Sequence, residues 1–157
     1  MGVVVRRAVE RDLGDVCRIM VSTDPFVSLG YTWDMCCEAA LAALEEGWLL
    51  VGEVDGRVVG FIAFRVFDGF PLGGYVRAVA VEEGFRGLGV GSMLMDEAEK
   101  IIFGFRDNVF LLVSSFNSGA IAFYVRRGYE YVGEIRDAVI PGASEIIMRK
   151  RRSGKAD

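Results

Sequence analysis

Residues 86–92 read Arg-Gly-Leu-Gly-Val-Gly-Ser, and this stretch decides how the rest of the chain is interpreted. It follows an apolar run at residues 75–81 (YVRAVAV), typical of a buried strand, and precedes a segment with the apolar spacing of a helix. Residues without side chains let backbone N–H groups converge on an anion, and the N-terminus of the following helix adds about half a unit of positive charge. The loop therefore predicts a phosphate-bearing ligand.

Two common phosphate-binding motifs do not fit this loop. A Walker loop needs Lys and then Ser or Thr after its last glycine, but Val90 follows Gly89 and Ser92 follows Gly91. A Rossmann fingerprint that begins at Gly87 needs glycine at position 92 and an acidic strand end about 20 residues further on, and the sequence has neither. A glycine-rich turn that merely begins a helix is the structural alternative.

A second motif lies at residues 117–129, NSGAIAFYVRRGY, and follows the apolar run 109–114. Asn117 is expected to cap a short helix on which Ala120 and Tyr124, four residues apart, share one face. On spacing alone, Tyr124 is equally well explained as a core residue.

Together the two segments resemble the GNAT acetyltransferase superfamily. Its patterns are Arg/Gln-x-x-Gly-x-Gly/Ala after one strand and Asn-x-x-Ala-x-x-x-Tyr-x-x-x-Gly-Phe/Tyr after the next. The matching positions are Arg86, Gly89, Gly91, Asn117, Ala120, Tyr124, Gly128 and Tyr129. The order of expected elements also fits from Val3 to Arg149, so the resemblance covers nearly the whole chain.

The expected elements run strand, two helices, three strands, helix, strand, helix and two strands, which indicates a mixed α/β sheet. The resemblance implies a mostly antiparallel central sheet with helices on both faces, splayed at the cofactor cleft where the strands ending at Val81 and Ser114 part. Residues 1–150 are expected to form one domain and residues 151–157 a basic, flexible tail. The expected helix caps are Asp12, Thr32 and Asn117, and the last strands are expected at residues 131–140 and 144–149.

Composition limits the chemistry of the 157 residues. The chain has no histidine, which excludes histidine bases, histidine metal ligands and Ser-His-Asp or Cys-His nucleophiles. Its three cysteines match no disulfide, zinc or redox pattern, so no metal is expected. The net charge of −4 disfavours a nucleic-acid partner, although the basic run at residues 149–155 leaves RNA association as an alternative. No apolar run approaches the roughly 20 residues of a membrane helix, so we expect a cytoplasmic protein without a membrane partner and leave a homodimer open.

The resemblance further implies acetyl-CoA as cofactor. Its pyrophosphate is expected on backbone N–H groups of residues 86–92, and its pantetheine arm beside the end of the preceding strand like an added strand. The amine attacks the acetyl group directly, a backbone N–H stabilises the oxyanion, and Tyr124 protonates the leaving thiolate. The implied cofactor-binding residues are Val79, Ala80, Val81, Arg86, Gly87, Leu88, Gly89, Val90, Gly91, Ser92, Asn117, Ala120 and Tyr124.

One departure concerns the general base. Many relatives place a glutamate in the strand before the glycine loop, and residues 75–81 contain none. Glu82 is the candidate base, and a solvated surface position for Glu82 together with a water wire is the alternative.

Substrate recognition is expected from the loops 22–31 and 68–73, through Phe26, Tyr31 and Phe70, which either wall the amine site or cover the sheet. The sequence thus predicts an N-acetyltransferase acting on a peptide N-terminus or a small amine, most similar to the ribosomal-protein N-terminal acetyltransferase branch. The alternative is a CoA-binding sensor or assembly module without turnover.

Overall fold

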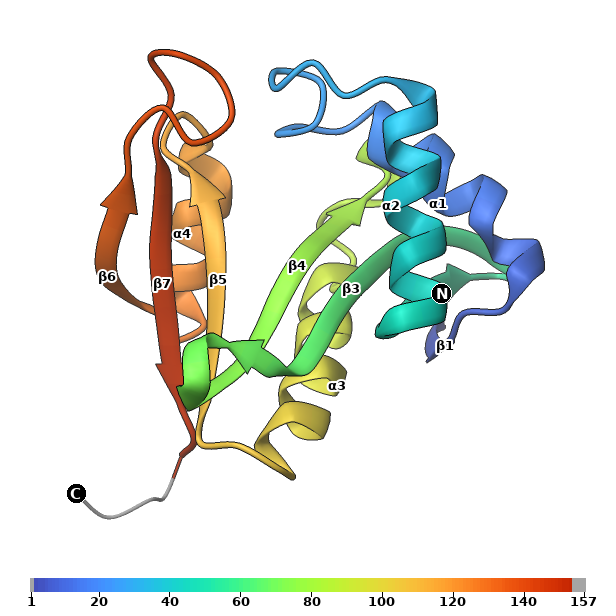
Figure 1. The fold of residues 1–157 in the computed structure, drawn as a ribbon. Coiled ribbons are helices and arrows are strands. Elements are labelled where there is room, and N and C mark those ends of the chain that lie inside the picture. The colour runs from blue at the N-terminus through green and yellow to red at the C-terminus, as the bar shows by residue number, and fades with distance from the viewer. Residues whose placement is uncertain (1, 154–157) are drawn as a thin grey trace.

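The computed structural model describes residues 2–153 and contains seven strands and four α-helices within that range (Figure 1). In chain order the elements are β1 (Val3–Arg7), α1 (Leu13–Val21), α2 (Trp33–Glu46), β2 (Trp48–Val54), β3 (Arg57–Gly69), β4 (Gly73–Val81), α3 (Val90–Phe103), β5 (Asn108–Ser114), α4 (Ser118–Arg126), β6 (Glu130–Ile135) and β7 (Glu145–Arg151). No helix in residues 2–153 is long and apolar enough to cross a membrane.

The strands form one sheet in the order β1-β2-β3-β4-β5-β7-β6. Every neighbouring pair in the described chain is antiparallel except β4 and β5, which are parallel. Their pairing covers only residues 74–76 of β4 and 109–111 of β5. Beyond these residues the two strands diverge, which Figure 1 shows as a widening gap between β4 and β5. The mixed, mostly antiparallel and splayed sheet expected from the sequence is therefore confirmed.

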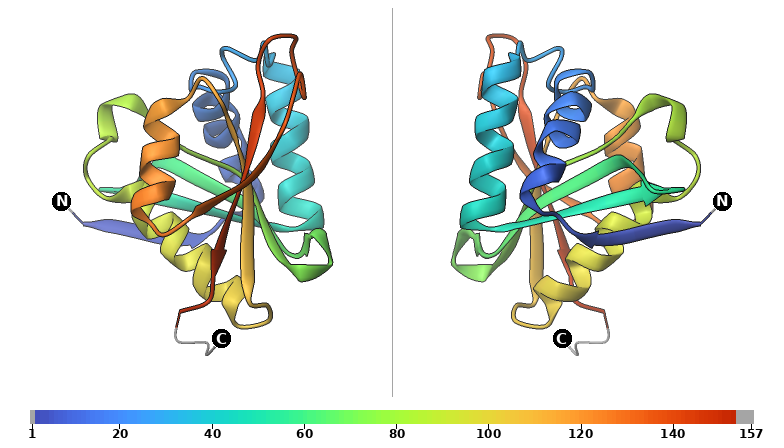
Figure 2. Two further views of the ribbon diagram at one scale, coloured as in Figure 1. Left: turned by 90° about the vertical axis from the view of Figure 1, so that its left-hand side faces the viewer. Right: turned by 90° about the vertical axis from the view of Figure 1, so that its right-hand side faces the viewer.

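Helices cover both faces of the sheet, with α3 and α4 on one side and α1 and α2 on the other (Figure 2). On the first side, Leu94, Met95 and Ile102 of α3 are fully buried against the strands. On the second side, Val16 and Ile19 of α1 are fully buried with Cys36 of α2. Side chains of successive strand residues alternate between these two layers, so each layer has its own core.

The last hairpin differs from expectation. Strand β6 ends at Ile135, not at residue 140, and residues 136–144 form a loop. Asp137 adopts a positive φ of 51°, and its carboxylate accepts a hydrogen bond from the Gly142 N–H at 2.7 Å. The β-branched pair Val139 and Ile140 is therefore held in a loop by a local side-chain contact that strand propensity does not register.

The expected basic tail begins inside the sheet. Arg151 is the last residue of β7, and the Arg152 N–H donates to the Asp107 carbonyl at 2.8 Å. The rest of the expected tail, residues 154–157, lies outside the described residues.

Two of the three expected caps hold. Thr32 and Asn117 accept hydrogen bonds at the starts of α2 and α4, from the Met35 and Ala120 N–H groups. Asp12 precedes α1, but its side chain makes no cap hydrogen bond to that helix, so the expected cap is wrong. Its oxygens accept from Arg6 at 2.8 and 2.9 Å, because the buried carboxylate lies beside this guanidinium of β1.

We expect Asp12→Asn to lower the free energy of unfolding by about 1.5–3 kcal/mol at neutral pH, because hydrogen bonds to a charged group are lost. Hydrogen bonds from Arg6, opposed by burial and aided by the Val9 N–H, hold the pKa of Asp12 below its usual value. The extra stability of the wild type over the variant is therefore fully present above the pKa of Asp12 in the unfolded chain, about 3.9. It is lost as pH falls through the lower pKa of Asp12 in the folded protein. Urea unfolding between neutral and acidic pH measures this difference.

The matched control is Asp55→Asn, at an exposed turn position with a positive φ that asparagine also adopts. Its stability should follow the wild type at every pH. An Asp12→Asn deficit that persists unchanged in acid would contradict the ion-pair explanation.

Candidate active site

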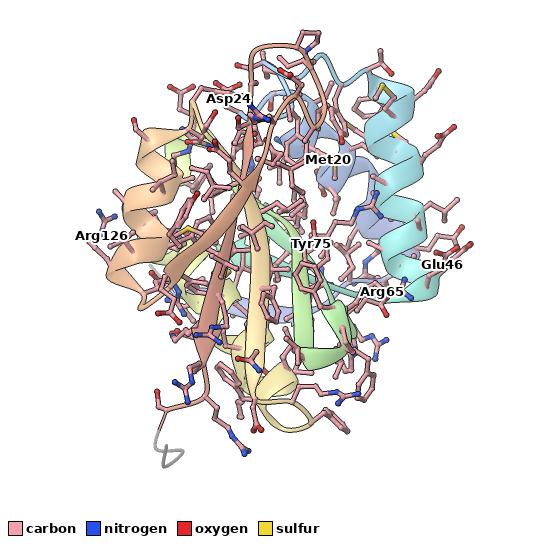
Figure 3. All side chains as sticks on the ribbon, turned by 60° about the vertical axis from the view of Figure 1, so that its left-hand side comes forward. Met20, Asp24, Glu46, Arg65, Tyr75 and Arg126 are labelled. Carbon is pink, nitrogen blue, oxygen red and sulfur yellow. The ribbon has the colours of Figure 1, made fainter. Side chains whose placement is uncertain are left out.

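A cavity of about 990 Å³ lies where β4 and β5 part. One end is lined by residues 85–87 and 89–92 and by the start of α4, and the other by residues from the segment 23–31 and from the β6–β7 loop. In Figure 3 Met20 and Tyr75, which both line the cavity, lie between α2 and the strands β5 and β7. The split in the sheet thus connects the two helical layers through one continuous space.

The glycine loop forms the first end of the cavity. Gly87 and Gly89 have φ of 81° and 85°, and a Cβ built on either residue meets nothing within 4 Å. Gly89 caps α3, and the first helical hydrogen bond runs from the Met93 N–H to the Gly89 carbonyl at 3.0 Å. The N–H groups of residues 90–92 therefore have no acceptor within the helix and are available to an anion.

Two expected loop residues sit differently from the rest. Leu88 is exposed and is not among the residues lining the cavity. Arg86 lines the cavity, but its Nε donates to the Val81 carbonyl at 3.2 Å, so its side chain folds back over the end of β4.

The end of β4 offers a free edge to the cavity. Residues 78–81 pair with β3 on one side, but β5 has left the other side after Val76. Val79, Ala80 and Val81 all line the cavity. Unpaired strand edges accept an extended chain as an additional strand, so this edge fits an extended amide-bearing arm.

Helix α4 brings Tyr124 to the same space. Asn117, Ala120 and Tyr124 line the cavity together, as their shared helix face predicts. The Tyr124 ring is 8% exposed and packs edge-on against Phe123 and Tyr129, with ring centroids at 5.4 and 5.7 Å.

The Tyr124 hydroxyl is an accessible proton donor. It has no hydrogen-bond partner within residues 2–153. In that range Arg127 Nε is the one side-chain nitrogen or oxygen that is both fully buried and without a partner. The Tyr124 hydroxyl is therefore not fully buried and can be reached from the cavity that its side chain lines. Burial raises the pKa of Tyr124 well above its usual value, which keeps the hydroxyl protonated at neutral pH.

Glu82, the expected base candidate, lies outside the residues that line the cavity. Its carboxylate is paired with Arg18 and accepts from Arg57 at 3.0 and 2.9 Å. Burial raises its pKa, but the hydrogen bonds from Arg18 and Arg57 outweigh it and hold the pKa of Glu82 below its usual value. The structure therefore gives Glu82 a role in joining α1, β3 and β4.

The expected substrate residues divide into two groups. Phe26 and Tyr31 line the cavity and pack edge-on, with centroids 5.3 Å apart. Phe70 does not line it: the side chain is 57% exposed and packs against Phe110 at the closed end of the sheet. The aromatic signal at Phe70 was misleading because the β3–β4 connection lies at the opposite end of these strands from the glycine loop.

Several lining residues escape sequence reasoning, namely Tyr75, Arg77, Ala138, Val139 and Glu145. The apolar run 75–81 predicts a strand but does not indicate that Tyr75 and Arg77 line the cavity. The β6–β7 loop, whose residues 136–140 were expected as strand, carries Ala138 and Val139 to the cavity, and Pro141-Gly142 is its one signal in the sequence. Glu145 is the first residue of β7.

A sequence model described as the Acetyltransferase (GNAT) family matches residues 15–129. The chain belongs to this family. It is 33% identical over 115 residues to an N-alpha-acetyltransferase of Sulfurisphaera tokodaii, a match that covers 66% of this chain and 68% of the relative. The Ard1 structure of Thermoplasma volcanium is 27% identical with a TM-score of 0.79, over 96% of this chain and 98% of that chain.

The structure of an aminoglycoside 6'-N-acetyltransferase complexed with coenzyme A shares the fold, with a TM-score of 0.82 over 98% of this chain and 99% of that chain at 16% identity. As a member of the GNAT family, the protein is an acyltransferase that takes its acetyl group from acetyl-CoA and transfers it to an amine. The open glycine cradle, the free N–H groups of α3 and the unpaired β4 edge fit this cofactor.

We expect Gly89→Ala to weaken binding of desulfo-CoA at least about tenfold, or about 1.4 kcal/mol, because the new Cβ stands in the cradle that a pyrophosphate must approach. Isothermal titration calorimetry measures the affinity directly.

Gly56→Ala is the matched control. Gly56 has a φ of 80° and open space around its Cβ position, but it lies in the β2–β3 turn and does not line the cavity. Both variants carry the same backbone penalty of about 1–2 kcal/mol. Equal affinity of Gly89→Ala and Gly56→Ala would show that the loop is only a structural turn.

Proposed function

We propose that this protein acetylates the α-amino group of a peptide N-terminus. The observation that carries the proposal is the single cavity that joins the glycine cradle, the Tyr124 hydroxyl and the loops 23–31 and 136–144. A cofactor entering from the α3–α4 side and an amine entering from the α1–α2 side meet in this space.

The choice of a peptide is supported by the relatives and by the acceptor end of the cavity. The Sulfurisphaera relative is named as an N-alpha-acetyltransferase, and Ard1 of Thermoplasma volcanium has the same fold at 27% identity. Apolar side chains of Phe26, Leu29 and Val139 line the acceptor end. They offer a surface for the first side chain of a peptide, beside an opening between two loops.

The main chain of β4 is assigned the binding and polarising role. Bound acetyl-CoA supplies a thioester carbonyl that an amine can attack. The unpaired edge at residues 79–81 orients the pantetheine arm, and a backbone N–H of this edge stabilises the negative charge that develops on the carbonyl oxygen. Residues 86–92 hold the pyrophosphate through backbone N–H groups.

Tyr124 is assigned the general acid. Its hydroxyl opens to the cavity, bears a proton at neutral pH and belongs to the helix that starts beside the cofactor end. It donates its proton to the CoA sulfur as the thiolate leaves, which lowers the activation free energy by neutralising the negative charge on that sulfur.

The proposal assigns residues 1–150 to one catalytic domain that works in the cytoplasm. The free thiols of Cys17, Cys36 and Cys37 are typical of a reducing compartment. The net charge of −4 gives no support for a nucleic-acid partner.

Mass spectrometry after incubation with acetyl-CoA tests the acceptor. The panel contains peptides that differ in their first residue, the same peptides with a blocked N-terminus, polyamines and an aminoglycoside. Acetylation of free N-termini alone supports the proposal. Acetylation of polyamines or the aminoglycoside without peptides would reject it, and stabilisation by acetyl-CoA without any product would favour the non-catalytic CoA-binding alternative.

We expect Tyr124→Phe to lower kcat by about 10²–10⁴, the usual contribution of general-acid catalysis, with little change in the KM for acetyl-CoA. Its melting temperature should stay close to wild type, because the hydroxyl has no partner within residues 2–153 to lose. Steady-state kinetics and thermal melting on one preparation measure both effects.

Tyr129→Phe is the matched control on the neighbouring ring. The Tyr129 hydroxyl donates to Glu99 at 2.8 Å and does not line the cavity. This variant should lose about 1–3 kcal/mol of stability while the folded enzyme keeps its kcat. The same pattern in Tyr124→Phe would remove Tyr124 from catalysis.

A further inference from the structure

The cavity holds few groups able to take a proton from an amine. Among the described residues that line it, the carboxylates are those of Asp24 and Glu145. Glu82 lies elsewhere in two ion pairs, and the strand before the glycine loop has no acid. The general base is therefore to be sought between Asp24 and Glu145.

The Asp24 carboxylate accepts its hydrogen bonds from within its own loop. Its Oδ1 accepts from the Ser28 hydroxyl at 2.6 Å and from the Ser28 N–H at 3.0 Å, and the side chain is exposed at the rim. These bonds, the hydroxyl first, hold the pKa of Asp24 below its usual value. An exposed, hydrogen-bonded carboxylate of this kind is a weak base for an amine.

Glu145 differs in burial and in partners. It is the first residue of β7, is 8% exposed, and lies opposite Ser114, the last residue of β5. Its Oε2 accepts from the Ser114 hydroxyl at 2.6 Å. Its Oε1 has no hydrogen-bond partner within residues 2–153 and is not among the fully buried atoms without a partner in that range. This oxygen can therefore be reached from the cavity.

Glu145 and the free β4 edge both lie beyond the point where the sheet splits. The last β4–β5 pair joins Val76 to Leu111, and Ser114, the partner of Glu145, lies three residues further along β5. Val79 lies beyond Val76 on β4, past an irregularity in the β3–β4 register, and belongs to the edge assigned to the pantetheine arm. Glu145 and Val79 both line the cavity, so the carboxylate lies in the space where the amine and the thioester would meet.

The strand alternation sets the side from which Glu145 acts. Val113 and Val76 pack in the core under α3 and α4, so their neighbours Ser114 and Tyr75 point to the opposite, α1–α2 side. Glu145 shares that side because it is paired with Ser114. Tyr124 comes from the α4 side. Tyr75, Arg77 and Glu145 all line the cavity.

We propose that Glu145 is the general base of the acetyl transfer, with Ser114 as the positioning residue that holds its carboxylate. This inference rests on the proposed amine acetylation but not on the peptide as acceptor. The substrate ammonium gives one proton to Glu145, and the freed nitrogen lone pair forms the C–N bond as the C–S bond breaks. Tyr124 protonates the departing sulfur and regains a proton from the new amide nitrogen, while Glu145 releases its proton to solvent.

The test uses Glu145→Gln, which keeps the shape and an oxygen that accepts from Ser114 but cannot take a proton. The assay is amine-dependent thiol release with the best acceptor of the wild type, whichever class it belongs to. We expect kcat at neutral pH to fall by about 10²–10⁴, while the melting temperature and the affinity for desulfo-CoA stay at the wild-type values. Glu145→Asp, which keeps a carboxylate, should recover part of the loss.

A pH series separates proton removal from packing. With a peptide acceptor, the deficit of Glu145→Gln should shrink as pH rises past about 7.7–8.0, because the α-amine then arrives without its proton. Tyr75 and Arg77 of β4 and Tyr31 of the α1–α2 loop face the same region and are unchanged in this comparison. A deficit that is constant with pH would indicate a structural role only.

Glu82→Gln is the matched control, because Glu82 directly follows β4 but does not line the cavity. It should keep kcat. A Glu145→Gln enzyme with wild-type kcat, or a Glu82→Gln enzyme with the larger loss, would overturn the assignment while leaving the acetyl transfer intact. Absence of amine-dependent thiol release by the wild type would overturn both.

Discussion

The short parallel pairing of β4 with β5 is the constraint on which the site depends. The two strands are bonded over residues 74–76 and 109–111 and then separate, which leaves backbone donors and acceptors of β4 without a strand partner. Close packing fixes the paired end: a Cβ on Gly74 would lie 2.6 Å from Ile102 of α3. Because α3 packs closely against β4 at this end, its N-terminus and the glycine loop lie at the other end, where β4 and β5 have separated. There they line the same cavity as the unpaired edge of β4.

A buried ionic cluster fixes the other wall of the split. Glu99 of α3 accepts from Tyr129 at 2.8 Å, from Lys150 of β7 at 2.7 Å and from Arg127 at 3.2 Å. Arg127 also reaches Asp96 of α3. The end of α4 is thereby tied to α3 and β7 at once, and a carboxylate with this many donors is well compensated for its burial. Tyr124, one turn earlier on α4, is carried by this anchored helix.

Sequence reasoning succeeded where the physics is local. The glycine loop, the Asn117 cap and the shared face of Ala120 and Tyr124 depend on neighbours in the chain, and the structure brings them to one cavity. It failed where the outcome depends on distant partners. Glu82 is not a candidate base because its carboxylate is paired with Arg18 and Arg57, which lie 64 and 25 residues away in the chain. Glu145 reaches the cavity only through its pairing with β5, which the local pattern of residues 144–149 does not encode.

The split sheet brings the two residues that we propose as acid and base, Tyr124 and Glu145, to one cavity. A carboxyl group and a phenol differ in their reference pKa values by about six units, so at neutral pH the first can accept a proton and the second can donate one without any histidine. The sheet separates the two groups: Tyr124 lies in the apolar layer under α3 and α4, while Glu145 faces the α1–α2 side and accepts a hydrogen bond from Ser114. Apolar burial favours the neutral form of Tyr124, because it raises the pKa of this hydroxyl. With the proposed acid on α4 and the proposed base on β7, the assignment needs no carboxylate from β4, and residues 75–81 contain none.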